Sequence, residues 1–172
     1  MIKLYAYFKK LATVKNIILF FVLSLLVNLL FAKSHVVLEF GIPDTHLYYT
    51  AKDFYALMEK YTQKEIGIYI RGILLLDFIY PIFYSLFLTL FIFGLSHKTH
   101  LSLLPFGVLI FDYLENLSVL TLIMLMPSRY MYLATFAGYF TFAKWILASL
   151  CLIIVLIYMV RYFIKLKFRR NE

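Results

Sequence analysis

Residues 101–126 read LSLLPFGVLIFDYLENLSVLTLIMLM, and this stretch decides the class of the protein. As a helix rising about 1.5 Å per residue, it is long enough to cross the roughly 30 Å hydrocarbon core of a bilayer. Two acids, Asp112 and Glu115, interrupt the apolar run. A charged side chain at the centre of a membrane helix costs about 2.5–3.5 kcal/mol, so we expect both acids to face protein or water rather than lipid.

Three further apolar runs occupy approximately residues 16–32, 68–95 and 134–161. Hydrophobic residues make up 64% of the 172 residues and charged residues only 15%, against about a quarter in soluble domains. The sequence therefore predicts an all-α membrane protein, a four-transmembrane-helix bundle forming one integral membrane domain over residues 1–172. The single cysteine, Cys151, lies inside the last run, which excludes an intramolecular disulfide and a thiolate metal cluster.

The distribution of charge predicts how the chain is oriented. Basic residues precede the first run, follow the last run and occupy the short loop near residue 98, whereas acids balance the bases of the long loop 33–67. These basic residues are Lys3, Lys9, Lys10, Lys15, Lys98, Arg161, Lys165, Lys167, Arg169 and Arg170. By the positive-inside rule we expect both termini in the cytoplasm, the loop 33–67 outside, and the cell (inner) membrane as the location. The basic ends favour contacts with anionic lipids over nucleic acid.

The external loop contains a predicted amphipathic helix. The capping-box spacing of Thr50 and Asp53 indicates a helix start, and a helix over about Lys52–Tyr61 follows. Its apolar stripe at i, i+3, i+4 and i+7 consists of Phe54, Leu57, Met58 and Tyr61. We interpret this segment either as an anchor at the membrane surface or as a lid over a cavity between the spans. A second box, Thr62 with Glu65, predicts the start of the second membrane helix.

Ionisable and polar residues cluster on single faces of the predicted spans. Asp77 lies in the second span and Lys144 in the fourth. In the third span, the spacing i, i+3 and i+4 places three polar residues on one helix face: Asp112, Glu115 and Asn116. In the second span, the spacing i, i+3, i+4 and i+7 gives Asp77 a shared face with Tyr80, Pro81 and Tyr84. Because Pro81 has no amide, we expect a free carbonyl at Asp77 and a kink beside it. Asp77 and Lys144 lie at similar depth and are candidates to pair, with Asp112 and Glu115 nearer the midplane. We expect all four to face one another inside the bundle rather than the lipid.

The three acids exceed the single lysine, so we expect bound protons or a cation at this place. We interpret Asp77, Asp112 and Glu115 as catalytic, proton-handling or cation-binding groups. Lys144, Asn116, Tyr84 and Tyr80 are the candidate ligand-binding residues. The alternative is a polar clamp in which these groups only bind one another across the helices. The sequence holds no nucleotide-binding or metalloprotease motif, and we expect no metal or other cofactor.

The motifs around these residues resemble those of a known family. The stretch LDFIYPIFY at 76–84, FDYLEN at 111–116 and Lys144-Trp145 are similar to a family of small bacterial four-span membrane proteins to which no activity is assigned. More distantly, the layout resembles the emopamil-binding and sigma-2 receptor group, which has four spans and an acid shortly before a proline in the second. The first resemblance implies the fold, and neither implies an activity.

The favoured function is binding, with acid–base conversion as an extension, of a hydrophobic or lipid-like molecule in an acidic intramembrane cavity. Its partners would be membrane lipids and one hydrophobic small molecule. Two alternatives stay open. One is a small proton-coupled carrier or transporter subunit, which needs a homo-oligomer because four helices enclose little volume. The other is an accessory membrane protein that binds partner helices.

Overall fold

Helices account for all regular secondary structure in the residues that the computed structural model describes, 2–35 and 40–169. Four helical segments are long and apolar enough to cross a membrane: Val14–Lys33, Gln63–Ser96, Thr99–Met124 and Met131–Lys165. The predicted all-α bundle of four membrane helices is therefore confirmed. Residues 36–39 of the predicted external loop and Arg170 among the basic residues lie outside the described part of the chain.

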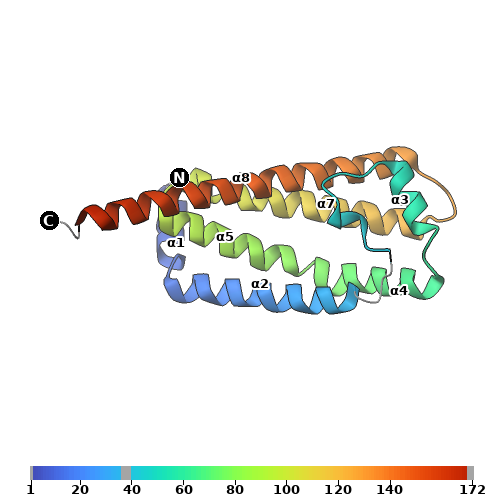
Figure 1. The fold of residues 1–172 in the computed structure, drawn as a ribbon, viewed down its shortest axis with the longest axis horizontal. Coiled ribbons are helices and arrows are strands. Elements are labelled where there is room, and N and C mark those ends of the chain that lie inside the picture. The colour runs from blue at the N-terminus through green and yellow to red at the C-terminus, as the bar shows by residue number, and fades with distance from the viewer. Residues whose placement is uncertain (1, 36–39, 170–172) are drawn as a thin grey trace.

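The bundle has a core of three helices with a fourth on its side. α5 (Tyr80–Ser96), α7 (Leu104–Met124) and α8 (Met131–Arg169) pack on one another, and α2 (Val14–His35) packs on α5. The short helices α1 (Ile2–Leu11) and α6 (Thr99–Ser102) lie at one end of the bundle. The C-terminal end of α8 lies at that end too, and residues 40–62 lie toward the other end (Figure 1).

The second membrane helix is interrupted beside Asp77. α4 (Gln63–Gly72) continues into the π-helix η2 (Ile73–Asp77), and α5 begins after a break with Pro81 in its first turn. The carbonyl of Asp77 accepts a hydrogen bond from Asn116 Nδ2 of α7 at 3.3 Å, and the carbonyl of Phe78 accepts one from Tyr113 Oη at 2.7 Å. The break predicted from Pro81 is present, and α7 side chains satisfy the carbonyls that it leaves without helical partners.

The segment before α4 folds as the capping boxes predict. Thr50 and Asp53 form the first box, at the start of α3 (Ala51–Met58), and Thr62 and Glu65 form the second, at the start of α4. Hydrogen bonds from Thr50 hold the pKa of Asp53 below its usual range, so the first box is intact at neutral pH.

The buried face of α3 differs in part from the predicted stripe. Phe54, Met58 and Tyr61 are buried as expected, but Leu57 is only partly covered and Tyr55 is buried in its place. The helix also ends at Met58, three residues earlier than expected. The reason is tertiary, because the hydroxyl of Tyr55 accepts a hydrogen bond from the Tyr130 amide at 2.7 Å and so turns this side chain toward α8.

Residues 40–62, the external segment of the predicted topology, are held against α8 by close backbone contact. Arg129, two residues before α8, forms an ion pair with Glu59, the residue after α3. Further along α8, Gly138 lies directly against the backbone of Tyr49, and a Cβ added there would overlap the carbonyl oxygen of Tyr49. The segment can therefore lie on α8 only because residue 138 has no side chain.

We predict that Gly138→Ala displaces the segment 40–50 from α8. The methyl group forces the backbone of Tyr49 outward, and such overpacking costs about 1–3 kcal/mol. Limited proteolysis in detergent micelles should cut the segment at least several-fold faster than in the wild type. The matched control is Gly94→Ala, whose methyl group meets only Ile17 Cδ1 at an ordinary 3.6 Å. Equal cleavage rates for the two variants would contradict the prediction.

Candidate functional site

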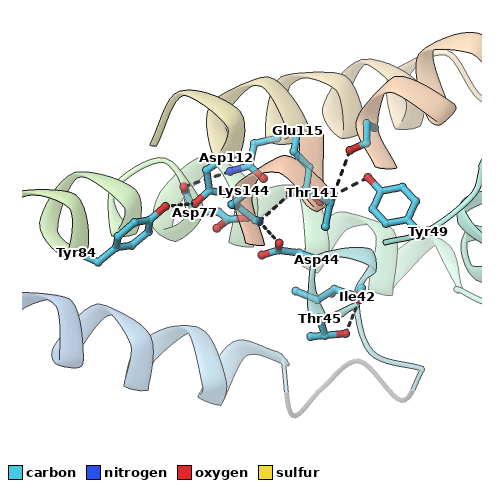
Figure 2. Close-up of polar contacts among 12 residues, drawn as sticks. Ile42, Asp44, Thr45, Tyr49, Asp77, Tyr84, Asp112, Glu115, Thr141 and Lys144 are labelled. Atoms are coloured by element: carbon cyan, nitrogen blue, oxygen red, sulfur yellow. Dashed lines mark hydrogen bonds and ion pairs between the residues drawn. The ribbon is translucent and has the colours of Figure 1, made fainter. Parts of the chain in front are cut away.

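An ammonium group surrounded by carboxylates forms the centre of the bundle at the end covered by the external segment. Lys144 of α8 reaches α7, where its Nζ lies 2.7 Å from Glu115 Oε2 and 3.2 Å from Asp112 Oδ1. Its third partner is Asp44 of the short 3-10 helix η1 (Pro43–Thr45) in the external segment. Figure 2 shows the three carboxylates converging on this one nitrogen.

Lys144 has no free hydrogen-bond donor in this arrangement. A lysine ammonium carries three N–H groups, and Asp44, Asp112 and Glu115 accept one each. The side chains of Lys144, Asp112 and Glu115 are at most 7% exposed, whereas that of Asp44 is 23% exposed. The three-carboxylate contact is thus sealed on the helix side and partly open on the side of the external segment.

Asp77 lies beside this group without joining it. The residue is only 4% exposed, and Figure 2 shows it next to Asp112 and Lys144. Its carboxylate forms neither a hydrogen bond nor an ion pair with any residue that the structure describes. The candidate pair of Asp77 and Lys144 is therefore absent among the described residues, whereas the prediction that the charged side chains of the three spans meet inside the bundle is confirmed. The physical reason for the absent pair is that Asp44, arriving from the external segment, takes the third N–H of the ammonium.

The predicted tyrosines of α5 have different surroundings. Tyr84 donates its hydroxyl proton to Asp112 Oδ2 at 2.8 Å and so joins the acidic group. Tyr80 Oη instead accepts a hydrogen bond from Asn28 Nδ2 of α2 at 3.4 Å. The two rings meet edge to face with centroids 5.1 Å apart, so Tyr80 touches the site through Tyr84. Of the two, only Tyr84 contacts a carboxylate directly.

Asp44 and Tyr49 are the site residues that the sequence analysis missed. Tyr49 Oη lies 3.5 Å from Glu115 Oε1, and burial, together with the charge of Glu115, raises the pKa of Tyr49 well above its ordinary value. The phenol therefore stays protonated and donates. Gly41, at φ 76°, turns the chain into η1, and the neighbouring Ile42 is buried. The run Gly41-Ile42-Pro43 was the available signal for Asp44 in the sequence. An apolar turn within a polar loop indicates that the chain packs against the protein at that point.

Apolar side chains border the site along the bundle in both directions. On the side of the external segment lies a cluster of buried residues that includes Ile73, Val119 and Ala137. On the side of the termini lies a second cluster, with Val108 and Cys151 at its centre. The charged groups thus lie in a region of low dielectric, where their interactions are strong and unpaired charges are expensive.

The carboxylates also have the spacing of a cation site. One oxygen each of Asp44, Asp112 and Glu115 lies within 4.8 Å of the others, and oxygen ligands suit hard cations. In this structure the ammonium of Lys144 touches all three carboxylates and takes the place of such a cation. Lys144 is thus a tethered counter-charge for three of the acids, which leaves Asp77 as the buried acid outside its contacts.

No protein-family model, curated protein or solved structure matches this chain at a significant level. The resemblance of the two acidic motifs to small bacterial four-span proteins therefore stays a prediction.

We predict a large loss of stability for a substitution at Lys144 and almost none for one at Asp77. Lys144→Met leaves three buried carboxylates without their counter-charge and should lower the free energy of unfolding by about 3–5 kcal/mol. Asp77→Asn removes no hydrogen bond or ion pair of the described residues and should change the free energy of unfolding by less than about 1 kcal/mol. Unfolding by increasing mole fraction of sodium dodecyl sulfate in mixed micelles, followed by circular dichroism, measures both. Lys98→Met, at an exposed lysine of a short loop, is the control.

An Asp77→Asn variant as unstable as Lys144→Met would contradict this division of roles, because it would make Asp77 part of the clamp. So would a Lys144→Met variant that unfolds like the wild type.

Proposed function

We propose that this chain is an integral membrane protein that binds a hydrophobic or lipid-like molecule at the acidic site, with Asp77 as the group that faces the ligand. The observation that carries the proposal is that the carboxylate of Asp77 has no partner among the described residues, beside a lysine whose three donors are already used. A buried ionisable group without a partner is unfavourable, and such groups in membrane proteins mark functional sites by default.

The proposal separates the polar residues into two roles. Asp112, Glu115 and Lys144 hold the external segment through Asp44 and set the electrostatic field of the site. Asp77 is the acid left to exchange a proton or to bind a ligand. Asn116 supports the backbone at Asp77, and Tyr84 fixes the orientation of Asp112. Acid–base conversion of the ligand, where it occurs, would use Asp77 as the proton donor or acceptor.

An apolar groove next to the site supports a hydrophobic ligand. It encloses about 290 Å³ along α8 and is lined by Leu47, Phe142, Trp145, Ile146, Ser149 and Leu150. Leu47 follows Asp44 by three residues in the external segment, and Trp145 follows Lys144 in α8. A molecule with its apolar part in this groove would therefore lie beside the two segments that bring Asp44 and Lys144 together.

We infer that the protein lies in the inner membrane of the cell with both termini in the cytoplasm and the segment that carries Asp44 outside. The support is the concentration of lysine and arginine in the parts of the chain at the end of the bundle that holds α1 and the C-terminal end of α8 (Figure 1). In this orientation the site opens toward the outer leaflet.

Cysteine labelling tests the orientation. In a background in which the buried Cys151 is replaced by alanine, Lys64→Cys should react with a membrane-impermeant maleimide in intact cells. Lys98→Cys, at the opposite end of the bundle, should react only after the membrane is permeabilised. Both lysines are exposed, so accessibility to the reagent depends on the side of the membrane. The reverse pattern would overturn the proposed orientation.

Native mass spectrometry of gently extracted protein tests the binding. We expect the wild type to carry an additional hydrophobic molecule that is absent from a groove-filling variant, Ile146→Trp. Ile110→Trp makes the same change at a similarly exposed position of α7, outside the groove, and should retain the molecule. Equal occupancy in all three proteins would show bulk lipid contact only and would contradict the proposed function.

A further inference from the structure

We infer that the ligand is an amphipathic cation: a molecule whose apolar chain lies along the α8 groove and whose positively charged head meets the acidic site at Asp44. This inference rests on the proposed function and specifies the chemical class of its ligand. Three observations support it: the excess of acids, the direction in which the site is open, and the position of the groove.

The acids of the site outnumber its bases. Asp44, Asp77, Asp112 and Glu115 lie around a single lysine, and Asp77 is within electrostatic range of Asp44 and Asp112. In a region of low dielectric such an excess has to be neutralised, by bound protons or by a cation. A positively charged ligand head offsets the excess, whereas a carboxylate or phosphate head increases it.

The negative charge is accessible on one side only. The side chains of Asp112 and Glu115 are 5% and 2% exposed, but that of Asp44 is 23% exposed. Asp44 contacts Lys144 through its Oδ1. A carboxylate has two oxygens, so Asp44 can accept from Lys144 with one and bind an incoming cation with the other.

The groove lies beside the stretch of chain that carries Asp44. Leu47 at its edge belongs to the segment that carries Asp44, and the adjacent Tyr48 packs its ring on Tyr139 and Phe142 of α8, with centroids 5.8 and 6.3 Å apart. A volume of about 290 Å³ is at the lower end of ligand pockets, which suits one alkyl chain better than a diacyl lipid. The negative charge of Asp44 suits a positively charged head group, and the apolar wall of the groove suits an alkyl chain. A ligand with both parts is an amphipathic cation.

Trp145 allows a direct test, because it is the only tryptophan of the chain and lines the groove. Three 12-carbon probes with the same brominated chain differ only in the head group: a primary amine, an alcohol and a carboxylate. They are titrated into the full-length protein in phosphatidylcholine nanodiscs at neutral pH, and quenching of Trp145 fluorescence is recorded. Partitioning into empty nanodiscs is measured separately, so that each probe is expressed as its mole fraction in the bilayer.

We expect saturable quenching by the amine with half-saturation at a mole fraction at least tenfold lower than for the alcohol, and the weakest binding for the carboxylate. Asp44→Asn removes the charge that the head meets and should reduce the preference for the amine at least threefold, and Asp77→Asn should reduce it as well. The control Glu59→Gln removes the same charge from an exposed ion pair of the surface and should leave the preference intact.

The outcomes separate the two proposals. Saturable quenching with no preference for the amine, or with the carboxylate preferred, overturns the cationic ligand but leaves binding of a hydrophobic molecule in place. Quenching that rises linearly with mole fraction for all three probes reports annular lipid only and overturns both. The wild-type comparison needs no variant to fold, so the inference is tested even where Asp77→Asn is unstable.

Discussion

The ion contacts of Lys144 are the interaction on which the rest of the structure depends. A charge transferred from water into a protein interior loses several kcal/mol of hydration, and one pair at 4 Å regains about 4 kcal/mol at an effective dielectric constant of 20. One partner therefore does little more than offset the desolvation of Lys144, whereas Asp44, Asp112 and Glu115 together use all of its donors. This one nitrogen thereby joins α7, α8 and the external segment. The close approach of the Tyr49 backbone to Gly138 and the hydrogen bond from the Tyr49 hydroxyl to Glu115 hold the same segment next to this ion cluster.

The interruption of the second membrane helix gives Asp77 a different character from the other acids. A π-helical turn that ends at the acid, followed by a proline, leaves carbonyls without helical partners, and in a bilayer that is tolerated only where other groups bind them. Asn116 and Tyr113 of α7 do so. The side chain of Asp77 receives no such compensation from the described residues. A polar clamp would have no use for this acid, because the other three carboxylates already satisfy Lys144. Helix distortions of this kind are frequent at functional sites. The distortion here ends at Asp77, which is also the acid without a partner among the described residues.

Local rules predicted much of the architecture, and tertiary contacts decided the remainder. The four spans follow from apolar length, both capping boxes from residue spacing, and the break beside Asp77 from the missing amide of Pro81. The shared face of Asp112 and Glu115 follows from helical periodicity. The partners of Lys144 could not be derived in this way. Asp44 is separated from it by 100 residues, and in sequence it is one acid among several in a polar loop. Its arrival depends on contacts such as Tyr130 with Tyr55, which no local pattern encodes.

The surroundings of the site favour a ligand that enters from the bilayer over a solute that crosses the bundle. Among the described residues, apolar clusters lie on both sides of the charged groups along the bundle, so a polar solute moving along the axis would have to pass both. A molecule already dissolved in the membrane meets no such barrier, because the α8 groove is open at the lipid-facing surface and reaches the external segment at Leu47. Asp44 belongs to that same segment and is the most exposed of the three carboxylates that meet at Lys144. The most exposed acid of the site and one residue of the groove wall therefore belong to the same short stretch of chain, an arrangement that suits the proposed amphipathic ligand.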